Sequence, residues 1–337
     1  MERNSHQIKT LQQAIKYFAD EQVCIDTVAS LRWADGKPTC PACGHQDHYY
    51  LATQKRWKCK ECYKQFSVKL GTIFEDSPIT LDKWLIALWM LTNCRNGISS
   101  YEVSRDLGIT QKSAWFVLHR LRLAMREGIL KKIGGSGSEI EADETFIGGK
   151  TKNMHKRRKE ALQRAQNASL RGDTRLIGKT VVMGLLDREQ RKIRAAVVPN
   201  TKRETLQAEI LKQVEEGSLM YTDESTSYMG LTKKYAHQVV NHLEQYVDGR
   251  VSTNGIENFW SLLKRGLNGT YVAVEPFHLF RYVDEQVFRY NSRKRSDGKK
   301  LSDGERFQMA LSQIAGKRLT FAELTGKTPD ASNATPA

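Results

Sequence analysis

The sequence predicts an α/β protein in which a sheet domain follows a helical, cysteine-containing N-terminal region. Apolar runs typical of strands occur at residues 140–147, 180–186, 193–198 and 219–222, and residues 203–214 between the last two have helical periodicity. Three strands, a helix and a fourth strand are typical of an α/β sheet domain. The chain of 337 residues is long enough for two or three domains.

The N-terminal part is predicted to be helical on both sides of a short irregular unit. Apolar positions between residues 8 and 18 recur at helical spacing, residues 33–66 are short polar segments with paired cysteines, and a helical pattern returns at 81–93. Residues 134–138, rich in glycine and serine, are expected to be a flexible linker. The predicted segments are 1–32 (N-terminal helical segment), 33–75 (cysteine-containing unit), 76–133 (helix-turn-helix region), 138–295 (sheet domain with a basic insertion at 151–176) and 296–337 (helical segment and disordered tail).

Residues 99–126 have the pattern of a helix-turn-helix. Two amphipathic helices flank Gly108, and the second would enter a major groove with its first residues. Such helix pairs are common, but the basic run through Arg126 favours DNA contact. The residues expected to contact DNA are Gln111, Lys112, Ser113 and Arg120 in this region, Lys156, Arg157 and Arg158 in the basic insertion, and Arg265 in a later helix.

The charge of the chain indicates a polyanionic partner. There are 53 Lys and Arg against 38 Asp and Glu, a formal net charge of +15, and the basic residues form clusters along the whole chain. A merely solubilising surface explains such clusters poorly, so we expect nucleic-acid binding. Together with the helix-turn-helix pattern, the expected partner is double-stranded DNA. No stretch approaches the roughly 18 to 20 apolar residues of a membrane helix, and the polar start MERNSHQIKT has no signal-peptide core. We expect a cytoplasmic protein without membrane contact.

Four of the six cysteines have the spacing of a zinc ribbon. Cys40-Pro-Ala-Cys43 is followed, after fifteen residues, by Cys59-Lys-Glu-Cys62. Each pair forms a turn that presents two thiolates, and four thiolates complete the tetrahedral shell of one Zn²⁺ ion. Four protein ligands leave no open position for substrate, so the predicted zinc is structural. Basic residues around the ribbon make it a further candidate for DNA contact.

Three acidic residues of the sheet domain are candidates for a catalytic metal site. Asp143 interrupts an apolar strand, Asp223 directly follows the last strand, and Glu257 lies at the start of a helix, seven positions before Lys264. An isolated charge on a buried strand is costly unless a cation compensates for it. If the first and fourth strands are neighbours and the helix crosses their ends, the three carboxylates converge and would hold Mg²⁺ or Mn²⁺.

Each of these acids also has a simpler interpretation. Glu257 would complement the N-terminus of its own helix without any metal. Glu144 and Glu224 stand directly beside the two aspartates and are rival ligands. The sequence alone leaves these alternatives open.

Several strings of the chain resemble one family. EIEADETFIGGK, YTDESTSY and STNGIENFWSLLKRGLNGTYVAVEPFHLFRYVDEQVFRYNSR, in this order after the ribbon, are similar to bacterial insertion-sequence transposases of the fifteen-ninety-five group. The resemblance covers roughly residues 20–295. It implies an RNase H-like, retroviral integrase-like catalytic domain, catalysis by Mg²⁺ or Mn²⁺, and the terminal inverted repeats of a mobile element as substrate.

The resemblance also implies roles for individual residues. Asp143 and Asp223 match the two aspartates of the family, and Lys264 matches its trailing lysine. The third metal ligand varies in the family, and this chain offers both Asn254 and Glu257. We choose Glu257 and keep Asn254 as an assisting ligand.

Three functions are compatible with these residues. A transposase would cleave the element ends with metal ions and transfer the freed 3′ hydroxyl to target DNA, as a homo-oligomer because two ends are joined. A non-catalytic DNA-binding regulator would use the ribbon and the helix-turn-helix alone. A metal-dependent nuclease without strand transfer would use the same acids. The acidic residues favour an enzyme, since a regulator gains nothing from carboxylates that repel DNA.

Overall fold

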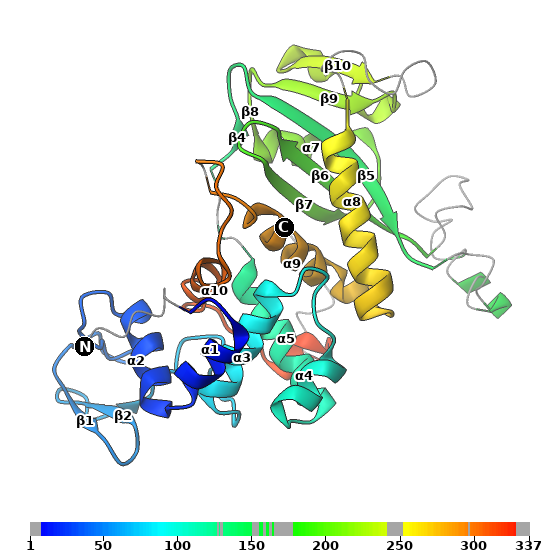
Figure 1. Cartoon of the computed structure of the whole chain (residues 1–337). Coiled ribbons are helices and arrows are strands. Elements are labelled where there is room, and N and C mark those ends of the chain that lie inside the picture. Colours follow the sequence, from blue (N-terminus) through cyan, green and yellow to red (C-terminus); the bar gives the residue numbers. More distant parts are fainter. Residues whose placement is uncertain are drawn as a thin grey trace. The chain divides into compact units, whose positions relative to one another are not determined.

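The computed structural model divides the chain into two compact units, which we treat separately. The helical unit comprises residues 1–127 and 292–337, and the sheet unit comprises residues 128–291 (Figure 1). The structure describes residues 8–126, 128, 131–149, 155–157, 160, 161, 164, 178–240, 252–295 and 297–327. Within these residues no helix is long and apolar enough to cross a membrane.

Helices make up most of the helical unit, and local signals set their ends. Thr10 and Gln13 form a capping box at the start of α1, and Ser99 and Glu102 form another at the start of α4. Helix α3 is apolar around most of its circumference and is therefore buried over nearly its whole length. The helices are α1 (Leu11–Phe18), α2 (Glu21–Arg32), α3 (Leu81–Asn93), α4 (Ser100–Leu107), α5 (Gln111–Met125), α10 (Asp303–Leu311) and α11 (Phe321–Leu324).

The C-terminal segment belongs to the helical unit. Phe307 of α10 is fully buried, with its ring centroid 5.7 Å from that of Phe18 and 5.4 Å from that of Trp89. An isolated β-bridge joins Thr72 to Ala315. Residues from both ends of the chain therefore share one core.

Helices α4 and α5 form the helix pair that the sequence predicts. Gly108 ends α4 in the left-handed conformation, with φ of 58°, which glycine adopts without the steric cost that a Cβ brings. Helix α5 then begins with Thr110 as its N-cap. From Val117 onward nearly all side chains of α5 are buried, so only its first two turns offer surface.

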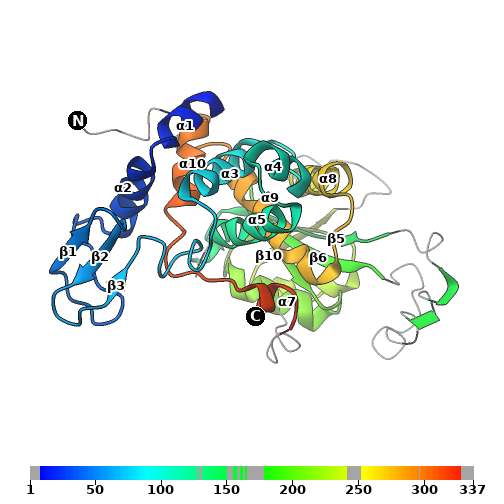
Figure 2. The ribbon, with the colours of Figure 1, turned by 90° about the horizontal axis from the view of Figure 1, so that it is seen from below.

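The cysteine-containing unit is a small antiparallel sheet. It consists of β1 (His48–Leu51), β2 (Arg56–Cys59) and β3 (Gln65–Phe66), in that order (Figure 2). Trp57 packs against Trp33, with ring centroids 5.2 Å apart, and stacks on Phe66 at 5.9 Å. Trp57 is thus the apolar core of this unit.

A five-stranded sheet forms the centre of the sheet unit, in the order β10-β9-β5-β6-β7. Neighbours β5, β6 and β7 are antiparallel, β9 is parallel to β5, and β10 is parallel to β9. The four strands predicted from apolar runs are confirmed, whereas the short strand β10 was not predicted. The strands are β5 (Glu139–Ile147), β6 (Thr180–Asp187), β7 (Lys192–Val198), β9 (Leu219–Asp223) and β10 (Ala236–Val240).

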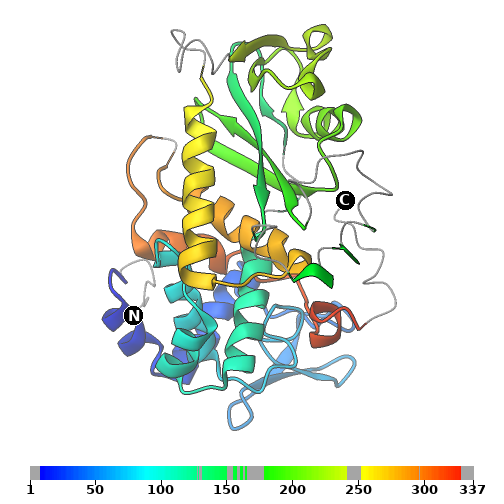
Figure 3. The same ribbon diagram turned by 90° about the vertical axis from the view of Figure 1, so that its right-hand side faces the viewer.

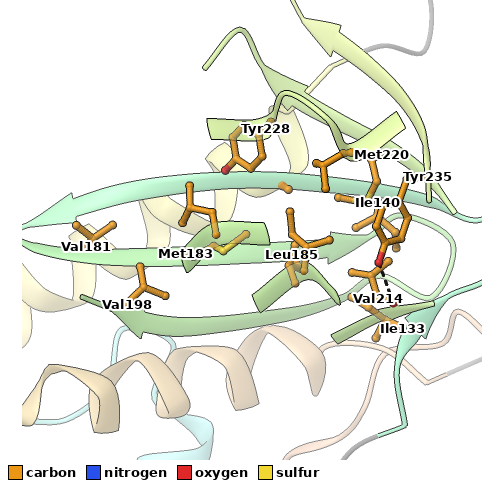
Figure 4. Close-up of a cluster of buried hydrophobic side chains, with 14 residues drawn as sticks. Ile133, Ile140, Val181, Met183, Leu185, Val198, Val214, Met220, Tyr228 and Tyr235 are labelled. Carbon is orange, nitrogen blue, oxygen red and sulfur yellow. Dashed lines mark hydrogen bonds between the residues drawn. The ribbon is translucent and has the colours of Figure 1, made fainter. Parts of the chain in front are cut away.

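Apolar clusters cover both faces of this sheet. Alternate residues of β5 point to opposite faces: Ile140 and Ala142 pack with Leu206 and Ile210 of α7 (Figure 4). The opposite face is covered by α8 and α9, and α8 runs alongside β5 (Figure 3). The helical elements are α7 (Arg203–Gln213), η4 (Thr226–Tyr228), η5 (Leu231–Lys233), α8 (Asn254–Gly266), the π-helical turn η6 (Leu267–Tyr271), η7 (Pro276–His278) and α9 (Leu279–Asn291).

The expectation that residues 134–138 form a flexible linker is wrong, because this segment is hydrogen-bonded within the sheet unit. The short strands β4 (Ile133–Gly134) and β8 (Val214–Glu215) pair with each other. The Gly135 N–H donates to Ser218 Oγ at 2.9 Å. Composition indicated flexibility, but these long-range hydrogen bonds fix the backbone.

Candidate functional site

The four predicted zinc ligands lie together at one end of the ribbon. Cys40 and Cys62 have their sulfur atoms 3.6 Å apart, as do Cys43 and Cys59. All four sulfur atoms lie within 4.8 Å of one another. Zn–S bonds of about 2.3 Å in a tetrahedron place neighbouring sulfur atoms about 3.8 Å apart. The cluster therefore fits a zinc ribbon.

Strand pairing joins the two strands that carry the aspartates. The parallel ladder between β5 and β9 pairs Glu139 with Leu219 and Glu141 with Tyr221. Asp143 and Asp223 each follow the last of these pairs by two residues, so both lie on the face of the sheet that α8 covers. Asp223 also acts electrostatically on Asp143. The sequence-based expectation that the first and fourth strands are neighbours is confirmed.

Helix α8 crosses this face close to Asp143. The Trp260 indole N–H donates to Asp143 Oδ2 at 2.9 Å. On β6, Gly184 lies directly opposite Asp143 in the antiparallel ladder. A Cβ at Gly184 would meet two atoms of the Trp260 ring at 2.8 Å. The missing side chain therefore makes room for the indole that reaches the aspartate.

Glu257 lies in the first turn of α8. Its side chain is exposed, and Thr253 Oγ1 donates to its Oε1 at 3.1 Å. The carboxylates of Glu257 and Asp223 both act on Asp143 electrostatically. We call Asp143, Asp223 and Glu257 the acidic trio. The oxygen atoms of this trio are more widely separated than the sulfur atoms of the ribbon. In the described part of the chain, only the four cysteines form a group of three or more potential ligands within 4.8 Å of one another.

The pKa of Asp143 reflects its surroundings. Burial raises this pKa to about 6, and the negative charges of Asp223 and Glu257 add to the rise. Hydrogen bonds from the Trp260 indole and from the Glu144 backbone N–H act in the opposite direction. A carboxylate in this situation is one whose ionised form a bound cation would stabilise strongly.

The rival acids are placed differently. Glu144 points to the other face of β5, where the Tyr228 hydroxyl, part of the cluster around α7, donates to its carboxylate. Burial raises the pKa of Glu144 to about 7, with a further rise from Asp223 and Asp143. Glu224 is exposed to solvent next to Asp223.

The other predicted site residues on α8 are exposed. Asn254 is the first residue of the helix, one turn before Glu257 and on a similar side. Lys264 follows Glu257 by about two turns, and Arg265 comes directly after it. Both basic side chains are solvent-exposed, so α8 presents one acid, Glu257, near its start and two cations near its end.

The residues expected to contact DNA have different surroundings. In the helix-turn-helix, Lys112 is exposed, with its Nζ 4.9 Å from the Phe321 ring centroid, and the Gln111 amide donates to Ser100 Oγ at 2.9 Å. Ser113 is half-buried and donates its backbone N–H to the Thr110 hydroxyl. In the basic insertion, Lys156 and Arg157 are exposed, and Arg158 lies outside the described residues.

Arg120 requires a correction. Only 3% of it is exposed, and its guanidinium donates to the Glu75 carbonyl and lies over the Trp84 and Phe116 rings. An arginine enclosed in this way is not available to a phosphate. The basic run through α5 predicted an exposed side chain, but the contacts with Glu75, Trp84 and Phe116 bury Arg120.

Sequence reasoning missed the residues that surround the trio. Trp260, Gly184, Glu141 and Arg188 all contact it or the elements that carry it. One signal was present: a glycine inside the apolar run TVVMGLLD indicates a close approach by another element. The partner of that glycine, 76 residues later, had no local signal.

Comparisons with known proteins identify relatives of this chain. A protein in transposable element ISH50 of Halobacterium salinarum is 27% identical over 264 residues, covering 75% of this chain and 85% of that protein. A transposase-like protein of Haemophilus influenzae is 32% identical over 102 residues, covering 30% of this chain and 82% of that protein. A chain in the structure of the simian T-cell lymphotropic virus intasome in complex with PP2A regulatory subunit B56 gamma matches at 14% identity with a TM-score of 0.24, covering 55% of this chain and 60% of that chain.

Two family matches follow the division seen in the structure. Residues 19–65, which contain the four cysteines, match the transposase zinc-ribbon domain. Residues 134–291, which contain the sheet and the acidic trio, match the ISXO2-like transposase domain. The chain therefore belongs to the insertion-sequence transposases that combine this zinc ribbon with an ISXO2-like transposase domain.

Proposed function

We propose that this protein is the DNA transposase of an insertion sequence, which binds terminal inverted repeats and performs metal-dependent strand cleavage and strand transfer. The observation that carries the proposal is the β5–β9 pairing, because Asp143 on β5 and Asp223 on β9 both lie toward the face of the sheet that α8 covers. Asp223 and Glu257, the latter at the start of α8, both act electrostatically on the buried Asp143 carboxylate. Such a set opposes DNA binding unless cations are held there.

The residues of the trio fit Mg²⁺ or Mn²⁺. Carboxylate oxygens are hard ligands that these ions prefer, and the raised pKa of Asp143 marks a site where negative charge lacks compensation. Asp143, Asp223 and Glu257 would hold the ions, with Asn254 assisting. Bound there, the ions would activate an attacking water or 3′ hydroxyl and stabilise the leaving oxygen.

Other residues of the chain would orient the reactants. The Trp260 indole holds one oxygen of Asp143 and leaves the carboxylate in one orientation. Lys264 and Arg265, exposed near the end of α8, would bind DNA phosphates that flank the scissile bond. Gln111, Lys112 and Ser113 at the start of α5, together with Lys156 and Arg157, would add contacts to the element end. Two ends must be joined, so we expect a homo-oligomer on DNA.

The sheet supports an RNase H-like fold for the catalytic domain. Three consecutive antiparallel strands, β5, β6 and β7, are followed by two strands that are parallel to the first. In this arrangement the first and fourth strands lie together in the centre of the sheet, and each contributes one aspartate.

The proposal is tested with duplexes that carry the inverted repeats flanking the gene. Asp143→Asn and Asp223→Asn should each abolish strand cleavage in Mg²⁺, while affinity for the duplex stays close to that of the unchanged protein. Glu224→Gln is the matched control, because this neighbouring acid is exposed to solvent. Full cleavage by Asp143→Asn would reject the site. Specific binding of the duplex without any cleavage by the unchanged protein would favour a regulator.

A further inference from the structure

Arg188 lies directly after β6 and joins the elements that carry the acidic trio. Its side chain is 18% exposed and forms ion pairs with two acids of β5. Nε donates to Glu141 Oε1 at 2.6 Å, and an Nη donates to Glu139 Oε2 at 3.1 Å. The other Nη donates to Ser252, both to the carbonyl oxygen and, at 2.9 Å, to Oγ. The guanidinium carbon is 4.3 Å from the ring centroid of Tyr221 on β9.

Each of these contacts lies a few residues before one member of the trio. Glu141 precedes Asp143 by two residues on β5, and Tyr221 precedes Asp223 by two residues on β9. Ser252 precedes Glu257 by five residues at the entrance to α8. One planar cation therefore links three segments that are far apart in the sequence.

Glu141 extends this link into α8 itself. Its carboxylate is 3% exposed, and its Oε2 accepts the Ile256 backbone N–H at 2.8 Å. Unpaired N–H groups at the start of a helix favour a negative partner. Gly255 permits the close approach, since a Cβ there would lie 2.5 Å from Leu186 Cδ2 and 3.0 Å from both carboxylate oxygens of Glu141.

A buried ion pair of this kind contributes little net stability compared with apolar packing, but its geometry is specific. Guanidinium donors are fixed in one plane, so they define directions as well as distances. The cluster of Arg188, Glu139, Glu141 and Ser252 is thus better suited to positioning than to adding stability.

We propose that Arg188 is the positioning residue of the acidic trio: it fixes the relative placement of β5, β9 and the start of α8 so that the three carboxylates share cations. This inference rests on the proposed function, because it assigns a role toward the same metal site. Arg188 itself does not touch substrate. It acts through the backbone segments that carry Asp143, Asp223 and Glu257.

The test measures Mn²⁺ affinity by electron paramagnetic resonance on the full-length, zinc-loaded protein. Arg188→Met keeps most of the side-chain volume and removes all donors, and we expect the Kd for Mn²⁺ to rise roughly 10- to 100-fold. Arg188→Lys should give a smaller loss, since an ammonium keeps one ion pair but cannot serve three segments. Arg194→Met is the matched control: Arg194, on β7 of the same sheet, donates to the carbonyl groups of Gln213 and Lys131.

The outcomes separate the inference from the proposed function. Loss of Mn²⁺ affinity in Arg188→Met but not in Arg194→Met, at comparable melting temperatures, supports the positioning role. If Asp143→Asn abolishes Mn²⁺ binding while Arg188→Met and Arg188→Lys bind normally, the inference is overturned and the metal site stands. If Asp143→Asn leaves Mn²⁺ binding unchanged, the proposed function fails, and the inference fails with it. Equal losses of Mn²⁺ affinity in Arg188→Met and in the control Arg194→Met would show that Arg188 has only a structural role and would overturn the inference.

Discussion

At the scale of single residues, opposing influences act on Asp143. Burial and two neighbouring carboxylates raise its pKa to about 6, while the Trp260 indole stabilises the ionised form. At neutral pH the carboxylate is therefore mostly ionised, and it becomes protonated when the pH falls to about 6 or below. A cation and a proton compete for the same oxygen atoms in that range.

Trp260→Phe should move the acidic limb of the cleavage pH profile to higher pH. The variant keeps an aromatic ring against Gly184 but removes the N–H donor, so the pKa of Asp143 rises further. A protonated carboxyl does not hold a cation, so a higher pH is needed for the same activity. The measurement is the initial rate of strand cleavage from pH 5 to 9 at subsaturating Mg²⁺.

Trp89→Phe provides the comparison, because this buried tryptophan of α3 lies in the helical unit. It should leave the position of the acidic limb unchanged. A Trp260→Phe profile that coincides with that of the unchanged protein would show that the indole does not influence the ionisation of Asp143.

At the scale of secondary-structure elements, the ribbon depends on its metal ligands more than on its core. Its three strands are short, and Trp57, Trp33 and Phe66 are the main apolar contacts described there. Small sheets of this size do not fold alone in water. The free energy of zinc binding is therefore expected to supply the free energy of folding.

Cys59→Ser should lose the zinc ion and the local fold of the ribbon. A hydroxyl is a poor zinc ligand, and the remaining three sulfur atoms do not close the tetrahedron. Metal analysis of the purified protein and limited proteolysis within residues 33–75 measure the two effects. Cys24→Ala is the control: Cys24 donates its thiol to the Phe18 carbonyl, and burial raises its pKa to about 12, so it stays protonated. An unchanged zinc content in Cys59→Ser would refute the ribbon assignment.

At the scale of the whole molecule, the two ends of the chain complete one unit. Residues 292–337 belong with residues 1–127, and the sheet unit is inserted between them in the sequence. The helical unit is thus incomplete until the C-terminal segment has been made. The sheet unit has its own two apolar clusters.

Phe307→Ala should destabilise the helical unit by about 3–5 kcal/mol, the usual cost of removing a buried phenylalanine ring. Amide hydrogen exchange should accelerate in α1 and α3, which contribute Phe18 and Trp89 to the same contact, and should change little in β5 and β6. Met309→Ala, at an exposed position of the same helix, is the control. Uniform acceleration in both units would show that they do not unfold separately.

Local sequence signals determined the elements and the chemistry of their residues. The spacing of four cysteines predicted the ribbon, the apolar runs predicted β5, β6, β7 and β9, and helical patterns predicted α3, α4, α5 and α7. These signals come from residues close together in the chain, where spacing alone decides which side chains share a face. The order of acids along these elements was therefore visible before any tertiary contact was known.

Only the tertiary structure decided how these elements meet. The β5–β9 register, the fit of Trp260 over Gly184, the reach of Arg188 to Ser252 and the burial of Arg120 all join residues far apart in the sequence. Such contacts depend on packing and on hydrogen bonds between distant segments, and neither produces a periodic pattern that can be recognised in a single sequence. The sequence by itself determined which carboxylates exist and on which elements they lie, whereas the fold decided that β5, β9 and α8 present them on one face.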